Sequence, residues 1–388
     1  MAGVHGTVPH SIVVTGAKAA GSLEAAEDIV RQLASAELAM VLVFVSPFYD
    51  PSSFIKEISQ QMPDTPVFGC TTAGEIAPHG WEEDSVVALG FAAEDFIVSA
   101  CVLPDLSSFR IDGGISLCRE LYREFARRTE HCDAAHGSFG LIFIDGMCQR
   151  EEAVMSAIYA SLEDVPVVGG SAGDRLQFER SWVFYDGNAY TNAAVLILIR
   201  TSLPFRLFKC DNFEPTSNKM VVTEADIECR VVKEINAEPA ALEYSKAVGV
   251  DVTQLDAFAF AAHPVLVRVG GSFYARSIQR MDSDASLRFF CAVDEGMVLT
   301  VARARDPVES TREFLNKMKD EMGKVSIFLG FECLFRRLDV ERRQLSRGMS
   351  DLYRLNNVIG FHTYGEQYRS VHINQTLTGV AIGTRAPR

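Results

Sequence analysis

A short glycine motif occurs three times in this chain, and the repeat limits how the chain can fold more than any other feature. The copies span residues 67–75, 167–174 and 358–366. Each has two apolar residues, a glycine, a short and mostly small or polar stretch, a second glycine and an acid, and the second copy is one residue shorter. This repetition predicts that one structural unit is used three times.

The segments on either side of the motif repeat as well. Each copy follows an apolar run typical of a strand and then a helical stretch, and a second β-type run lies downstream. The first runs are 40–45, 140–144 and 325–329, the helical stretches 52–62, 151–162 and 334–356, and the last runs 85–91, 193–199 and 376–382. Alternating strands and helices predict an α/β fold of pseudo-repeated strand–helix–strand units that form mixed sheets with parallel pairs.

The spacing of the copies predicts an insertion. Gly69 and Gly169 are 100 residues apart, whereas Gly169 and Gly360 are 191 apart. The excess, over 205–300, contains short β-type runs and one helix near 239–248, so we expect a β-rich insertion in the C-terminal half. A helix over 310–321 then leads into the third unit. A boundary near 201–204 gives an N-terminal domain, 11–203, and a C-terminal domain, 204–384.

Charge and cysteine usage limit which classes of partner and which cellular compartment we expect for this protein. The formal charge is −14, which argues against nucleic acid and against anionic membranes as partners. The apolar runs are far shorter than the roughly 20 residues that span a bilayer, and the first residues do not form a signal peptide. The nine cysteines are an odd number without a CxxC pair, which fits a reducing compartment. We expect a cytoplasmic protein, and self-association stays open.

The motif itself is a candidate binding site. A strand that ends in glycine, followed by hydroxyl residues and a second glycine, predicts a tight turn with exposed backbone N–H groups. Such turns lie at the carboxyl ends of strands, where α/β sheets bind ligands. A glycine that only lets the chain turn would explain each copy singly, but three matched copies favour a ligand. The candidate ligand-binding residues are Gly69, Cys70, Thr71, Glu75, Gly360, Glu366 and Asn374.

These motifs carry a family resemblance. With the segment 360–383 (GFHTYGEQY, then HINQTLTGVAIG) and the pair His263-Pro264, the chain resembles the FIST family of signal-transduction sensors over about residues 11–383. Its two-part architecture, with no fused kinase or cyclase, is similar to the nitric-oxide-sensing haem proteins of that family. The resemblance implies haem b, nitric oxide as ligand, and a partner histidine kinase in a phosphorelay linked to cyclic-di-GMP and biofilm control. A haem-free sensor of a small metabolite such as an amino acid is the alternative.

A haem protein needs an iron ligand in an apolar pocket, with cations near the propionates. His263 lies in an almost wholly apolar stretch and is the leading candidate, with Arg268 and Arg276 placed to reach propionates. His362, in the third motif copy, and His372, before the last strand, are the other candidates. A lone histidine among apolar residues is more often a satisfied core residue. For the metabolite alternative, His372, Asn374 and Glu366 are the better candidates.

A catalytic function is the third alternative. Residues 169–173 resemble a nucleophile turn, so a hydrolase could use Ser171. The other motif copies carry threonine or histidine there, and no established catalytic motif is present. We therefore expect a sensor and not an enzyme.

Overall fold

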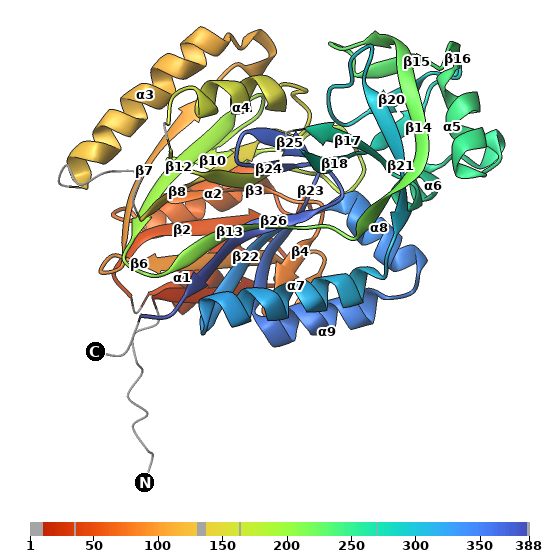
Figure 1. Cartoon of the computed structure of the whole chain (residues 1–388). Coiled ribbons are helices and arrows are strands. Elements are labelled where there is room, and N and C mark those ends of the chain that lie inside the picture. The colour runs from red at the N-terminus through yellow and green to blue at the C-terminus, as the bar shows by residue number, and fades with distance from the viewer. Residues whose placement is uncertain (1–10, 35, 130–136, 163, 270, 386–388) are drawn as a thin grey trace.

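The three motif copies belong to three units of one design in the computed structural model, which describes residues 11–34, 36–129, 137–162, 164–269 and 271–385 (Figure 1). The first unit comprises β1 (Ile12–Ala17), α1 (Ser22–Leu33), β2 (Leu38–Val45), α2 (Pro51–Gln61), β3 (Val67–Thr71), β4 (Glu75–Ala77), β5 (Gly80–Glu82) and β6 (Val86–Ala92). The second comprises β7 (Phe96–Leu103), α3 (Ile111–Arg128), β8 (Ser138–Ile144), α4 (Glu151–Tyr159), β9 (Val167–Ser171), β10 (Val183–Tyr185), β11 (Asn188–Tyr190) and β12 (Ala194–Thr201). The predicted α/β class with mixed sheets is confirmed.

The third unit contains the predicted insertion. It comprises β13 (Phe205–Cys210), α7 (Pro307–Met322), β22 (Val325–Cys333), α8 (Leu334–Arg342), α9 (Ser346–Asn356), β23 (Val358–Thr363), β24 (Glu366–Tyr368), β25 (Val371–Ile373) and β26 (Leu377–Gly383). Between β13 and α7 lie β14 (Phe213–Asp226), β15 (Val231–Ile235), β16 (Glu238–Pro239), α5 (Ala240–Val248), α6 (Ala257–Ala262), β17 (Val265–Val269), β18 (Ser272–Arg276), β19 (Ile278–Met281), β20 (Leu287–Phe289) and β21 (Val298–Ala304). The insertion thus starts after β13, which pairs with β26, and the predicted helix 334–356 is two helices.

Local sequence accounts for these elements. The strand β2 is apolar throughout, as expected for a strand covered on both faces. The helix α2 starts where the Asp50 side chain accepts a hydrogen bond from Ser53 N and Pro51 occupies the first turn. No helix in the described ranges is both long enough and apolar enough to cross a bilayer.

The units exchange their hairpins in a cycle. In each unit the parallel pair (β2–β3, β8–β9 or β22–β23) is completed by the hairpin of another unit. The hairpin β10–β11 adds to β3, β24–β25 adds to β9, and β4–β5 adds to β23, which gives three six-stranded sheets of the same order. No unit can therefore complete its sheet alone.

The first glycine of each motif lies inside a strand and not in a turn. A Cβ atom on Gly69, Gly169 or Gly360 would lie 1.8 Å from a carbonyl oxygen of the neighbouring parallel strand. A side chain at any of these positions would therefore collide with the backbone of the neighbouring strand. The expected tight turn at this glycine is wrong, because β3, β9 and β23 each continue beyond it.

Three phenylalanines mark the centre of the pseudo-threefold arrangement. Phe44, Phe143 and Phe331 occupy matching positions on β2, β8 and β22, and their ring centroids are 5.7, 6.4 and 5.8 Å apart. Residues from all three sheets form the core around them, and the helices of each unit pack on the outer face of its sheet. The insertion has a core of its own, which also includes Phe335 and Leu338 of α8, and it lies to one side of the units (Figure 1).

Candidate functional site

The three motif turns meet at the carboxyl ends of β3, β9 and β23 and hydrogen-bond to one another. Ala73 N donates to His362 O at 2.9 Å, and His362 N donates to Gly74 O at 2.8 Å. Ser171 N donates to Gly365 O at 2.8 Å. These N–H groups hold neighbouring turns together, so the expectation that they are exposed to a ligand is wrong.

The acids of the first and third copies stabilise their own turns. Glu75 accepts hydrogen bonds from the hydroxyl groups of Thr72 and Ser85. At positions 291 residues later, Glu366 accepts the matching bonds from Thr363 (2.5 Å) and Thr376 (2.7 Å). Burial raises the pKa of Glu75 to about 7 and that of Glu366 to about 8. Both carboxyl groups are enclosed by these partners.

The acid of the second copy holds a strained loop. Asp174 accepts hydrogen bonds from the backbone N–H groups of Phe178, Glu179 and Arg180, at 2.8 to 2.9 Å. Within this loop Arg175, Leu176 and Phe178 have φ of 61°, 66° and 53°. A left-handed conformation costs a non-glycine residue about 1–2 kcal/mol, and it persists where surrounding contacts fix it. Strain of this kind is typical of functional sites, and here the loop places Arg175 and Leu176 against the first and third units.

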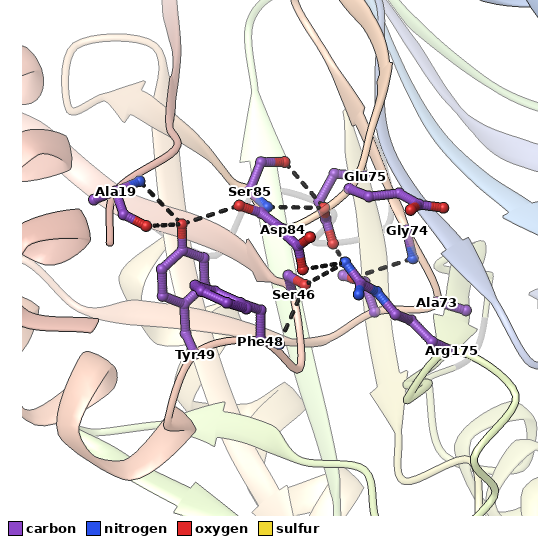
Figure 2. Close-up of polar contacts among 12 residues, drawn as sticks. Ala19, Ser46, Phe48, Tyr49, Ala73, Gly74, Glu75, Asp84, Ser85 and Arg175 are labelled. Atoms are coloured by element: carbon purple, nitrogen blue, oxygen red, sulfur yellow. Dashed lines mark hydrogen bonds and ion pairs between the residues drawn. The ribbon is translucent and has the colours of Figure 1, made fainter. Parts of the chain in front are cut away.

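Arg175 reaches across to the first unit (Figure 2). Its Nη2 lies 2.5 Å from Asp84 Oδ1 and 3.3 Å from Ser46 Oγ, while its buried Nε has no acceptor among the described residues. Tyr49 OH donates to Asp84 O at 3.0 Å and fixes that backbone. The Arg175 side chain thus joins the second unit to the first and stays 30% exposed.

A cavity of about 230 Å³ lies beside Arg175 and is bounded by all three units. It is lined by Ala73, Glu83, Arg175, Leu176, Leu334, Arg337, Leu338 and Glu341. The Nε atom of Arg337 lies 2.7 Å from Glu341 Oε1, and its Nη2 contacts Glu83. Two guanidinium groups and two carboxylates beside leucine side chains suit a small zwitterion. The sequence analysis did not identify Arg175 and Arg337 as candidates. The available signal for one side of the cavity was the pair Arg175-Leu176, which directly follows the motif acid Asp174.

A larger cleft, of about 670 Å³, lies beside His263, between the insertion and the end of α8. It is lined by Thr216, Ala247, Val248, Ala262, His263, Val301, Ala302, Arg303, Ala304, Arg342 and Arg343. His263 is half-buried at the end of α6, and burial together with Arg342 lowers its pKa, which favours the neutral imidazole. A neutral ring is the form that binds a metal.

Sequence comparison identifies the family. The FIST N domain matches residues 39–238, more than half of the chain, and the FIST C domain matches residues 240–369. The chain belongs to the FIST family. It is also similar to an uncharacterized protein, MJ1623, of Methanocaldococcus jannaschii, at 22% identity over 92% of this chain and 76% of the relative. Membership supports a role in sensing and signal transduction.

The other candidate haem residues of this FIST protein lie away from the cleft. Arg268 is exposed on β17, with its guanidinium 6.0 Å from the Phe273 ring. Arg276 Nη1 donates to His372 O at 3.1 Å. The cations at the cleft are instead Arg303, Arg342 and Arg343.

His362 and His372 lie in closely packed polar clusters. His362 is fully buried, with Nδ1 3.4 Å from Glu332 Oε2 and its ring edge-on to Trp81 at 5.0 Å. His372 Nδ1 lies 3.1 Å from Gln367 Nε2, and its buried Nε2 has no partner in the described structure. Neither histidine lines a cavity described above, and neither does Asn374, whose Oδ1 accepts from Ser277 N at 3.3 Å.

The remaining candidates of the motif are also enclosed. Cys70 is fully buried opposite Phe44, and burial raises the pKa of its thiol well above the ordinary value. Thr71 Oγ1 accepts a hydrogen bond from Trp182 N at 3.0 Å. Ser171 Oγ is buried and accepts from Gln367 Nε2 at 2.9 Å, so an amide separates it from His372. A serine nucleophile needs a base within direct reach, which this arrangement does not supply.

Proposed function

We propose that this FIST protein is a sensor that holds haem b in the cleft beside His263 and reports nitric oxide to a partner histidine kinase, within a phosphorelay linked to cyclic-di-GMP and biofilm control. One observation carries the proposal. The largest of the cavities described above combines a histidine of lowered pKa, three arginines and an apolar wall. These are the groups that a haem pocket requires.

The residues of the cleft fit this role. The backbone of His263 is fixed at both ends, because Tyr244 OH donates to His263 O at 2.6 Å and His263 N donates to Ala259 O at 3.1 Å. Its imidazole would hold the haem iron. Arg303, Arg342 and Arg343 would pair with the two propionates at the exposed rim. The bound haem would supply a ferrous iron that binds nitric oxide.

The test is the absorption spectrum of protein purified with haem supplied during expression. We expect a Soret band that shifts when nitric oxide is added to the reduced protein. We expect His263→Ala to bind haem at least about tenfold more weakly and to be rescued by added imidazole. The exposed His79 gives a matched control, since His79→Ala leaves the spectrum unchanged. A Soret band that is absent, or unaffected by His263→Ala, would refute the proposal.

A second candidate, a haem-free sensor of a small metabolite such as an amino acid, is favoured by the cavity beside Arg175. The partly exposed side chain of Arg175 would bind a carboxylate, and Glu83 and Glu341, which pair with Arg337, would attract an ammonium group. Calorimetric titration with the common amino acids tests it. We expect one of them to bind wild-type protein and Arg180→Gln, whose cation stacks on Trp182, but not Arg175→Gln. No binding by any of them would contradict this candidate.

A further inference from the structure

The second glycine of the motif makes room for different side chains in the first and third copies. At Gly74 the space of a Cβ atom is taken by the guanidinium of Arg337, which is paired with carboxylates. At Gly365 a Cβ atom would lie 2.9 Å from His372 Nε2 and 3.1 Å from Asn374 Nδ2. The third copy therefore places an imidazole nitrogen and an amide nitrogen together beside a glycine.

The His372 ring presents a proton on the nitrogen that faces Gly365. The Gln367 amide nitrogen Nε2 lies 3.1 Å from His372 Nδ1, and an amide N–H group can only donate, so Nδ1 accepts and Nε2 carries the proton. Burial lowers the pKa of His372, which favours the neutral ring. The side chain is 3% exposed, and Nε2 has no acceptor in the described structure. His372 is thus a buried donor of fixed orientation.

Asn374 supplies a second fixed donor at the same place. Its Oδ1 accepts a hydrogen bond from Ser277 N of the insertion at 3.3 Å, which determines that Nδ2 is on the opposite side of the amide. The Asn374 side chain is fully buried, and Nδ2 has no acceptor among the residues that the structure describes. Buried donors are nearly always paired in folded proteins, so these two require an acceptor atom.

Arg276 of the insertion adds a third donor and a positive charge. Its Nη1 donates to His372 O at 3.1 Å, while its buried Nε has no acceptor in the described ranges. The carboxylates of Glu151 and Glu152 are also near His372, but they lie 2.6 and 2.5 Å from Arg230 Nη2 and are neutralised in part by that cation. Within the described part of the chain Arg276 has no carboxylate partner of its own, which favours an anionic acceptor.

We propose that His372 Nε2, Asn374 Nδ2 and Arg276 Nε form a donor site that binds the carboxylate of a small molecule. A carboxylate accepts several hydrogen bonds through two oxygens, and bonds from charged donors are the strongest. The molecule must be small, of the size of formate or acetate, because the donors lie around a space that a single Cβ atom would fill.

The donor site is separate from both sites of the proposed function. None of its three residues lines the cleft beside His263 or the cavity beside Arg175. Arg276 belongs to the insertion, whereas His372 and Asn374 belong to the third unit. A bound carboxylate would therefore bridge these two parts of the molecule and stabilise their contact.

The test measures the melting temperature of the apo protein in sodium formate, acetate or chloride, at an ionic strength held constant with the bulky sulfonate MES. We expect formate and acetate to raise the melting temperature of wild type saturably, by about 2–4 °C at tenfold excess over the Kd. Asn374→Asp should abolish this increase, because it places an acceptor oxygen where the carboxylate would bind. It should also melt close to wild type without formate, since the new oxygen accepts from His372 Nε2.

Arg276→Gln is a second variant, at a partly exposed position, and should weaken formate binding at least tenfold. The matched control is Asn212→Asp, at a buried asparagine whose Oδ1 already accepts from Arg336 Nη1 at 2.7 Å, and it should keep the full formate response.

Three results would overturn the donor site. They are no saturable increase with either carboxylate, an equal increase in wild type, Asn374→Asp and Arg276→Gln, or an equal increase with chloride. The measurement uses protein without haem, so a formate response in a protein that never shows a Soret band would support the donor site and reject only the haem proposal.

Discussion

The three-unit core and the insertion differ in how tightly their characteristic residues are packed. In the core the motif turns are hydrogen-bonded to one another, and the glycines, phenylalanines and buried acids serve close packing. The insertion has no counterpart in the first two units, and together with the end of α8 it lines the larger cleft beside the half-buried His263. The comparison teaches that the repeated motif in this chain serves the scaffold, whereas the two cavities proposed as ligand sites are lined by segments that differ between the units: the insertion with α8, and the Arg175 loop.

The largest expected effect is a loss of unfolding free energy when a glycine of the core is replaced by alanine, compared with a glycine of the insertion. Gly69→Ala should cost more than about 4 kcal/mol of unfolding free energy, because its Cβ would lie 1.8 Å from Val43 O. Gly249 of the insertion has φ of 72°, and a Cβ atom added there would have no neighbour within 4 Å. Gly249→Ala should therefore cost only about 1–2 kcal/mol of unfolding free energy. Urea denaturation measures both. Similar losses would remove the distinction between a close-packed core and a tolerant insertion.

The next prediction concerns the ion pair between Arg230 of the insertion and Glu151 of the core. Arg230→Met should destabilise the protein by about 3–5 kcal/mol, because Glu151 would stay buried without its partner. It should also separate the unfolding of the insertion from that of the core. The exposed pair of Lys233 with Glu224 is the matched control on the same insertion, and Lys233→Met should have a far smaller effect. A single unchanged transition for Arg230→Met would contradict the role of this contact.

A smaller effect concerns the buried acids of the core. The pKa of Glu366 is raised from 4.5 to about 8. Between these values the folded protein keeps a proton that the unfolded chain has released. The contribution of this carboxyl group is therefore full below pH 4.5 and is lost as pH rises through 8. Glu366→Gln should remove this dependence, changing the wild-type-minus-variant stability by roughly 2–4 kcal/mol between pH 5 and 8.5.

A constant stability difference between wild type and Glu366→Gln over this pH range would show that Glu366 is ionised in the folded protein throughout.

The sequence predicts the units better than it predicts their assembly. Apolar runs and helical periodicity are local, so the parallel pairs and the helix α7 could be predicted, and the spacing of the glycines revealed the insertion. The exchange of hairpins could not, because β4 pairs with β23 more than 280 residues away and leaves no local signal.

The motif glycines illustrate the same limit. In the sequence, a glycine after apolar residues predicts a turn. In the structure these glycines lie inside strands, where a neighbouring carbonyl group leaves no room for a side chain. The partners of Arg175 and Arg337 come from separate units, so only the fold reveals that cavity. The constant offset of 291 residues between Thr72, Glu75, Ser85 and their counterparts was the available sign that these polar residues are structural.

Hydrogen–deuterium exchange with and without added haem tests most directly whether ligand chemistry belongs to the insertion. We predict slower exchange in α5, α6 and β21, which line the His263 cleft, and a smaller change in α4 through Arg230. The motif turns, already hydrogen-bonded to one another, should not change. Protection of the motif turns with no change around His263 would contradict the account.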